Sequence, residues 1–197
     1  IFLIVTGGLG WRVIDDIWSN KNNLSYRKLS LHSRLVIRTS LYLILFGSLG
    51  FFVTETLLNS QFFNDLNFFE KLLSSIFETV SARTAGFTNS PISLNSISDT
   101  GLLLLMSLMF IGASTGGTGG GIKTTTFIAL MAATRSILRG QKDVIISNRL
   151  ISDKVILKAV GITVGSLLFV LLMAMLLSMT NTFIKKESFT FLEILFT

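Results

Sequence analysis

Two apolar runs, each of membrane-spanning length, constrain the fold of this chain more than any other feature. Leu35 to Leu58 is interrupted only by Arg38 near its start and Glu55 near its end, and a second run extends from Val155 to Met179. A helix needs about 20 apolar residues to cross a hydrocarbon core. Only 14% of the residues are charged, against roughly a quarter in soluble domains. We therefore predict an all-α membrane protein.

The composition excludes several classes of site. Cysteine is absent and His32 is the one histidine, so disulfides, cysteine-based metal sites and metal sites with two histidine ligands are excluded. The net charge of +6 would suit nucleic acid. However, the basic residues lie beside the apolar runs rather than among aromatic side chains, which is typical of juxtamembrane charge. We therefore expect membrane lipid as a partner, no nucleic acid and no enzymatic activity.

Shorter helices are predicted between the two long runs. Phe68 to Ser81 is typical of a short amphipathic helix, with Asn67 as its N-cap. Another helix is predicted to begin at Asp99. Its apolar part, Gly101 to Gly112, is too short to cross a membrane at about 1.5 Å per residue. A second short apolar run follows from Ile122 to Ala133.

The distribution of lysine and arginine predicts the orientation of the chain. The segments from Arg12 to Arg38 and from Arg135 to Lys158 carry six such residues each, whereas Glu55 to Lys71 and Asn181 to Glu187 carry one and two. Basic segments remain on the cytoplasmic side of a membrane. We therefore predict that residues 11–34 and 135–154 are cytoplasmic and that residues 59–98 are extracellular.

One pattern of segments occurs twice. A basic segment, an apolar span, a polar outer loop and a short helix follow one another from Arg34 to Thr79, and again from Asp153 to Thr197. Such internal repeats are typical of transporters. Because the chain opens and stops inside apolar runs, we expect it to be a piece of a longer polypeptide built from helix, re-entrant loop and helix.

The stretch ARTAGF, after the helix predicted at residues 68–81, is a candidate cation site. The chain must return to the outside here, because the next helix starts there, and non-helical backbone at membrane depth is either buried in protein or lines water. Gly86 permits backbone angles that point carbonyls inward, and carbonyl oxygens can replace the hydration shell of a cation. The negative end of the preceding helix favours a cation as well. A buried outer loop without an ion remains the alternative.

The stretch ASTGGTGGGIKTTT, residues 113–126, allows two interpretations. A phosphate-binding loop needs G-x-x-x-x-G-K-[ST] after a strand. Gly116 and Gly121 have the right separation, but Ile122 places Lys123 one residue late, and the preceding run is of helical type. A nucleotide-binding enzyme is therefore disfavoured.

The second interpretation is an unwound centre between two half-helices, lining a cavity or buried in protein. The hydroxyls of Ser114, Thr115 and Thr118 would then satisfy freed backbone groups. Lying just below the re-entrant loop, the stretch would block or open an ion path. Lys123 would be a gating contact, an anchor for carbonyls, or a side chain that snorkels to the cytoplasmic face.

The succession of SARTAGF, an apolar half-helix and GASTGGTGGGIKTTT resembles the Trk/Ktr/HKT superfamily of potassium transporters, and most closely its KtrB-type membrane subunit. This resemblance implies four membrane helix–pore loop–membrane helix repeats around a central pore. It divides the chain as follows: the end of the second repeat at 1–16, closing with GGLGWRVIDD; a cytoplasmic linker at 17–34; a complete third repeat at 35–139, with pore helix and filter loop at 68–90 and a broken helix at 99–139; a linker at 140–153; and the first half of the fourth repeat at 154–197.

The resemblance also implies roles for individual residues. Gly86 would be the filter glycine, and one quarter of the K+ ligands would be the backbone carbonyls of Arg83, Thr84, Ala85 and Gly86. The side chain of Arg83 is expected to turn away from the ion, towards Glu78. The intramembrane gate, residues 113–125, would comprise Ser114, Thr115, Gly116, Gly117, Thr118, Gly119, Gly120, Gly121 and Lys123.

The implied function is potassium uptake across a bacterial plasma membrane. The alternatives are a non-transporting membrane scaffold and a sodium-selective or sodium-coupled transporter of the same fold. The implied partners are the remaining repeats, a second copy of the chain, and a ring of cytosolic regulatory subunits resembling KtrA or TrkA. ATP or ADP, and NAD, are expected only on that ring, so no cofactor is expected in this chain. The basic segment after the gate either docks this ring or only sets the topology.

Overall fold

The fold is described by a computed structural model for residues 1–21, 28–58, 61–63, 66–83, 85–87, 97–141, 143–147 and 149–184. The architecture is helical, as predicted. The α-helices are α1 (Phe2–Leu9), α2 (Trp11–Ser19), α3 (Leu31–Leu57), α4 (Phe68–Ala82), α5 (Asp99–Phe110), α6 (Thr124–Leu138) and α7 (Asp153–Ile184). The remaining elements are a 3-10 turn, η2 (Gln61–Phe63), and the strands β1 (Ile145–Ile146) and β2 (Arg149–Leu150).

Within the described residues, α3 and α7 are the helices long and apolar enough to cross a membrane. Both were predicted, but each is longer than its apolar run. The Ser30 side chain accepts a hydrogen bond from the Ser33 N–H and caps α3, so this helix begins at Leu31. Helix α7 continues past Met179 to Ile184, because no glycine or proline stops it there.

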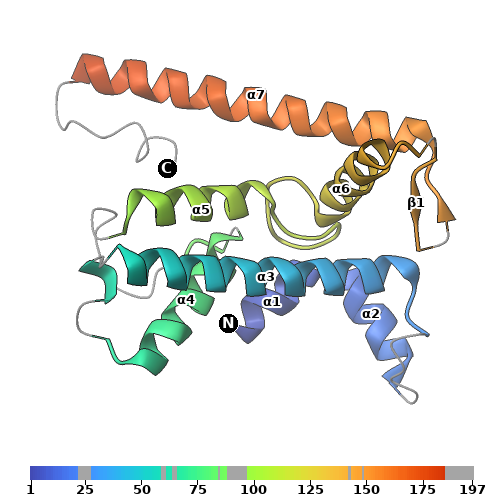
Figure 1. Cartoon of the computed structure of the whole chain (residues 1–197), viewed down its shortest axis with the longest axis horizontal. Helices are drawn as coiled ribbons and strands as arrows, with labels where there is room; N and C mark the ends of the chain where they lie inside the picture. Colours follow the sequence, from blue (N-terminus) through green and yellow to red (C-terminus); the bar gives the residue numbers. More distant parts are fainter. Residues whose placement is uncertain are drawn as a thin grey trace.

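Figure 1 shows how the shorter helices lie around these two. Helices α5 and α6 lie between α3 and α7 in this view, and α1, α2 and α4 are drawn below α3, although α4 also packs against α5. Both long helices begin at the end of the molecule that also holds α2 and the β1–β2 hairpin. The two basic segments therefore share one end, which agrees with a common cytoplasmic side.

Apolar side chains pack together where the last part of α3 meets η2 and α5. Phe51 of α3 is fully buried and meets the rings of Phe62 and Phe63 edge-on, at centroid distances of 5.5 and 6.5 Å. Leu105 of α5 belongs to the same cluster. Because lipid tails are as apolar as these side chains, the cluster is stabilised by close packing and dispersion rather than by exclusion of water.

A buried carboxylate holds the start of α5 against α3. Glu55 is fully buried and accepts hydrogen bonds from the Ser98 N–H at 3.3 Å and from the Ser98 hydroxyl at 2.5 Å. Ser98 in turn accepts from the Gly101 N–H at 3.1 Å as the N-cap of α5. A Cβ at Gly101 would overlap the Glu55 carboxylate, so only glycine leaves room for this contact.

At the beginning of α3, hydrogen bonds connect this helix to α2. The Ser30 N–H donates to Asp16 Oδ2 at 2.9 Å, and Asn20 donates to Asp16 Oδ1 at 3.2 Å. Hydrogen bonds from the Ser33 side chain and the Ser30 backbone lower the pKa of Asp16. Part of the segment predicted as a linker is therefore the end of α2 and the start of α3.

The hairpin was not predicted. Strands β1 and β2 pair antiparallel, with Ile145 opposite Leu150 and Ile146 opposite Arg149. Ser147 makes the turn with a positive φ of 47°. Strands of two residues are too short to show the alternation of apolar and polar residues by which a strand is recognised.

Candidate functional site

Two non-helical segments carry the residues singled out by the sequence. We call residues 83 and 85–87 the outer loop and residues 111–123 the glycine loop. The outer loop follows α4, which is capped as predicted: the Asn67 side chain accepts from the backbone at Glu70, and Glu70 accepts from the Asn67 N–H at 2.8 Å. The glycine loop joins the half-helices α5 and α6, so the predicted broken helix is present.

Ser81, near the end of α4, organises the outer loop. Its backbone carbonyl accepts from the Ala85 N–H at 2.9 Å, and its hydroxyl accepts from the Phe87 N–H at 2.8 Å. The same hydroxyl also contacts the Phe87 carbonyl oxygen. Ser81 is 3% exposed, so one buried serine holds both ends of this tight turn.

Gly86 gives the outer loop its conformation. Its φ is 70°, in the left-handed region that favours glycine. A Cβ at Gly86 would meet none of the described residues within 4 Å. Of the four predicted carbonyl ligands, the structure places those of Arg83, Ala85 and Gly86, while Thr84 lies outside the described residues.

The side chain of Arg83 connects the two loops. Its Nη2 donates to the Gly112 carbonyl at 3.1 Å, across to the start of the glycine loop. Its predicted turn towards Glu78, a buried residue of α4, stays a prediction. The contact with Gly112 was missed, because nothing in the sequence relates two residues so far apart.

The glycine loop folds back on the end of α5. The Ile122 N–H donates to the Phe110 carbonyl at 2.9 Å, and the Thr124 N–H donates to the Ala113 carbonyl at 3.4 Å. A Cβ at Gly112 would overlap the carbonyl of Gly120. Backbone therefore packs directly on backbone, which is possible only without side chains at these positions.

The middle of the glycine loop contacts the junction between α1 and α2. The Ser114 N–H donates to the Gly8 carbonyl at 2.9 Å, and the Trp11 N–H donates to the Gly116 carbonyl at 3.3 Å. The buried Ser114 hydroxyl, which was expected to satisfy freed backbone groups, makes no hydrogen bond to the part of the chain that the structure describes. The hydroxyl of Thr115 pairs with that of Thr125 at 3.2 Å. Backbone N–H groups of the loop instead donate to carbonyls of α1, at Gly7 and Gly8.

Lys123 lies at the end of the loop, as the N-cap residue of α6. Its Nζ donates to the Gly119 carbonyl at 2.7 Å. A charge-assisted hydrogen bond of this length is among the stronger contacts in proteins. Of the three alternatives for Lys123, this contact fits an anchor for carbonyls.

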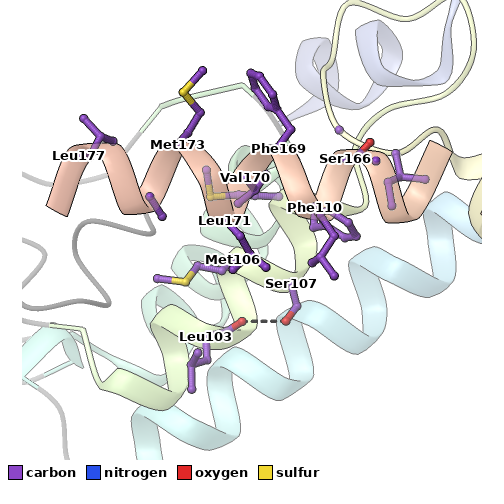
Figure 2. Close-up of a pocket in the computed structure, with 16 residues that line it drawn as sticks. Leu103, Met106, Ser107, Phe110, Ser166, Phe169, Val170, Leu171, Met173 and Leu177 are labelled. Atoms are coloured by element: carbon purple, nitrogen blue, oxygen red, sulfur yellow. Dashed lines mark hydrogen bonds between the residues drawn. The ribbon is translucent and has the colours of Figure 1, made fainter. Parts of the chain in front are cut away.

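A groove of about 950 Å³ lies between α5 and α7 (Figure 2). Its walls are mostly apolar, with Phe110 on one side and Phe169 on the other. The hydroxyls of Ser107 and Ser166 donate to carbonyls of their own helices, each at 2.8 Å. Because most of the lining side chains are apolar, the groove suits an apolar occupant rather than a cation.

Comparisons with known proteins find a matching family and several relatives. A family profile described as TrkH, a cation transport protein, matches residues 1–197. Ktr system potassium uptake protein B of Bacillus subtilis (strain 168) is 34% identical over 195 residues, which cover 99% of this chain and 41% of that protein. Ktr system potassium uptake protein B of Vibrio alginolyticus is 33% identical over 164 residues, covering 83% of this chain and 35% of that protein.

A third relative carries a broader name. The potassium/sodium uptake protein NtpJ of Enterococcus hirae is 32% identical over 193 residues, which cover 96% of this chain and 41% of that protein. The chain thus spans about two fifths of the length of the curated relatives it matches.

Proposed function

Because the chain belongs to the TrkH family of cation transport proteins, which are helical proteins of the plasma membrane, we propose that it is part of a potassium uptake protein. The observation that carries this proposal is the broken helix α5–α6, whose glycine loop touches the outer loop through Arg83. Irregular backbone at membrane depth is tolerated where it lines a path or is buried in protein. Two such segments in contact suit an ion pathway better than a scaffold.

The outer loop is proposed to supply one quarter of a potassium filter. The ligands would be the backbone carbonyls of residues 83–86, with Gly86 as the filter glycine. Two observations support this assignment: α4 ends at Ala82, directly before these carbonyls, and a Cβ at Gly86 would meet none of the described residues within 4 Å. The negative end of a helix favours a cation nearby. The Arg83 charge is engaged by the Gly112 carbonyl, which is compatible with passage of a cation.

The glycine loop is proposed to be the gate, comprising Ser114 to Gly121 and Lys123. Its support is the way the middle of the loop is held, by separate backbone hydrogen bonds at Ser114, Gly116 and Thr118. A typical hydrogen bond contributes only about 1 kcal/mol net. Such a loop can be displaced at low energetic cost, whereas a helix packed into a core cannot.

The partners are proposals as well. They are the remaining repeats of the full-length chain, a second copy of it, and a cytosolic ring of KtrA- or TrkA-like subunits that would bind ATP, ADP or NAD. The hairpin supports a docking role, because Ile145 and Leu150 are 62% and 65% exposed beside the basic Arg149. Topology-setting charge remains the simpler account of the basic residues.

The test uses the full-length protein in cells that lack their own potassium uptake. We expect the unaltered protein to restore growth at low potassium, and a protein with Gly116–Gly121 shortened to take up potassium faster. Gly161→Ala, at an α7 position with open space around its Cβ, serves as the control and should leave uptake unchanged.

Three outcomes would contradict parts of the proposal. Absence of potassium-dependent growth at normal expression would favour a scaffold. Faster uptake of sodium than of potassium would favour the sodium alternative. Unchanged or reduced uptake after shortening would contradict the gate.

A further inference from the structure

The segment GGLGW, residues 7–11, contains the break between α1 and α2 and has no role in the function proposed so far. Helix α1 ends at Leu9 and α2 begins at Trp11, with Gly10 between them at a φ of 83°. We propose that this junction is a latch that holds the glycine loop in its closed position, with Gly10 and Trp11 as positioning residues. The inference rests on the proposed role of the glycine loop as a gate.

Backbone hydrogen bonds run in both directions between the junction and the loop. The loop donates from the Ser114 N–H to the Gly8 carbonyl at 2.9 Å, and from the Thr118 N–H to the Gly7 carbonyl at 3.4 Å. The junction donates in return, from the Trp11 N–H to the Gly116 carbonyl at 3.3 Å. The last turn of a helix leaves carbonyls without partners, and here the glycine loop uses two carbonyls near the end of α1.

Glycines on the two facing surfaces allow this approach. A Cβ at Gly10 would lie 2.9 Å from the Gly117 nitrogen and the Thr115 oxygen, and 3.0 Å from the Gly116 carbonyl carbon. All three are backbone atoms, which cannot yield unless the loop itself moves. Conversely, a Cβ at Gly117 would lie 3.0 Å from the carbonyl oxygens of Gly7 and Gly8.

The side chain of Trp11 also lies against the glycine loop, at Gly116. Its indole Cδ1 lies 3.1 Å, and its Nε1 3.3 Å, from the position that a Cβ on Gly116 would take. The side chain is otherwise 62% exposed, so its indole is not part of a packed core. An exposed aromatic ring over a glycine backbone limits the movement of that backbone without joining the two segments into one unit.

The position of the contacts explains why they would act on the loop alone. The turn that joins α5 to α6 is closed by its own bonds, such as Ile122 to Phe110 at 2.9 Å, and does not depend on the junction. The junction holds only the middle of the loop, from Ser114 to Thr118. Releasing it would free that middle part and leave both half-helices in place.

The experiment compares two glycines of positive φ in the full-length protein. Gly10→Ala pushes a methyl group into the loop backbone. Gly140→Ala is the matched control, because Gly140 also has a positive φ, of 63°, and its Cβ would meet none of the described residues within 4 Å. One readout is potassium uptake. The other is the rate at which a thiol reagent modifies Ser114→Cys, with any other cysteines of the full-length protein replaced.

Ser114 suits this second readout because it is fully buried and its hydroxyl makes no hydrogen bond to the described residues. We expect Gly10→Ala to raise both uptake and modification by about two- to tenfold, the factor that corresponds to the loss of about one net hydrogen bond. Gly140→Ala should change neither. A merely structural role for Gly10 would lower uptake instead of raising it.

The outcomes separate the latch from the gate. Unchanged modification in a normally expressed Gly10→Ala protein overturns the latch, even if loop shortening still raises uptake. Faster modification without faster uptake supports the latch and contradicts the gate. If the Gly10→Ala protein does not reach the membrane, Trp11→Leu is measured instead. A rise in the modification rate of Ser114→Cys, smaller than the rise expected for Gly10→Ala, supports the latch, and no rise overturns it.

Discussion

Gly86 in the outer loop and Gly121 in the glycine loop have almost the same φ, 70° and 68°. Their surroundings differ completely. A Cβ at Gly86 would meet none of the described residues within 4 Å, whereas at Gly121 it would lie 2.8 Å from the Met109 oxygen and 2.9 Å from both the Gly112 nitrogen and the Phe110 oxygen. Among the described residues, Gly86 is therefore required for its backbone angle, and Gly121 also for the absence of a side chain.

This difference fits different roles for the two loops. The outer loop is held by Ser81, and no described residue lies within 4 Å of a Cβ at Gly86, where the proposed ion path would run. The glycine loop is packed against α5 and against the α1–α2 junction. In the outer loop the backbone at Gly86 is not covered by described residues, whereas the backbone of the glycine loop is packed against other backbone segments.

The largest effect is expected at Gly121. Replacement by alanine would add the strain of a left-handed residue to overlap with three backbone atoms, and we expect a loss of about 2–5 kcal/mol in the free energy of unfolding. Thermal unfolding of the purified full-length protein would measure it.

Gly165→Ala in α7 is the matched control for Gly121. Its Cβ meets nothing within 4 Å, and alanine is favoured over glycine in a helix by about 1 kcal/mol. Its melting temperature should stay the same or rise. Equal melting temperatures for the two variants would contradict the close packing of the glycine loop.

A smaller effect is expected at Ser81. Ser81→Ala removes the acceptor of the Phe87 N–H and loosens the outer loop by about 1 kcal/mol, so the ratio of potassium to sodium uptake should fall about fivefold. Ser75→Ala is the control, since this equally buried hydroxyl of α4 donates only to the Lys71 carbonyl of its own helix at 2.8 Å. A similar ratio in both variants would mean that Ser81 does not shape the filter.

The local elements of this fold could be read from the sequence. Asn67 and Glu70 predict the start of α4, and the apolar runs predict α3 and α7, because caps and hydropathy act over a few residues. The break between α5 and α6 follows from the run of glycines. The resemblance to potassium transporters adds the expected roles of both loops.

The contacts between segments could not be read in this way. Arg83 with Gly112, and Gly8 with Ser114, are pairs of distant residues that meet through backbone carbonyls, which every residue carries. Side-chain chemistry therefore gives no signal for them. GGLGW reads as the end of a helix, and only the structure brings it against the glycine loop.

The central claim is that the outer loop selects the ion while the glycine loop admits it. The most direct test measures potassium and sodium uptake by four full-length proteins: unaltered, Gly86→Ala, shortened at Gly116–Gly121, and the double variant. We expect Gly86→Ala to lower the ratio of potassium to sodium uptake, and shortening to raise the rate at an unchanged ratio. Effects at independent sites add as free energies, so the double variant should combine both. A shortened loop that by itself changes the ratio, or a Gly86→Ala protein with an unchanged ratio, would contradict the claim.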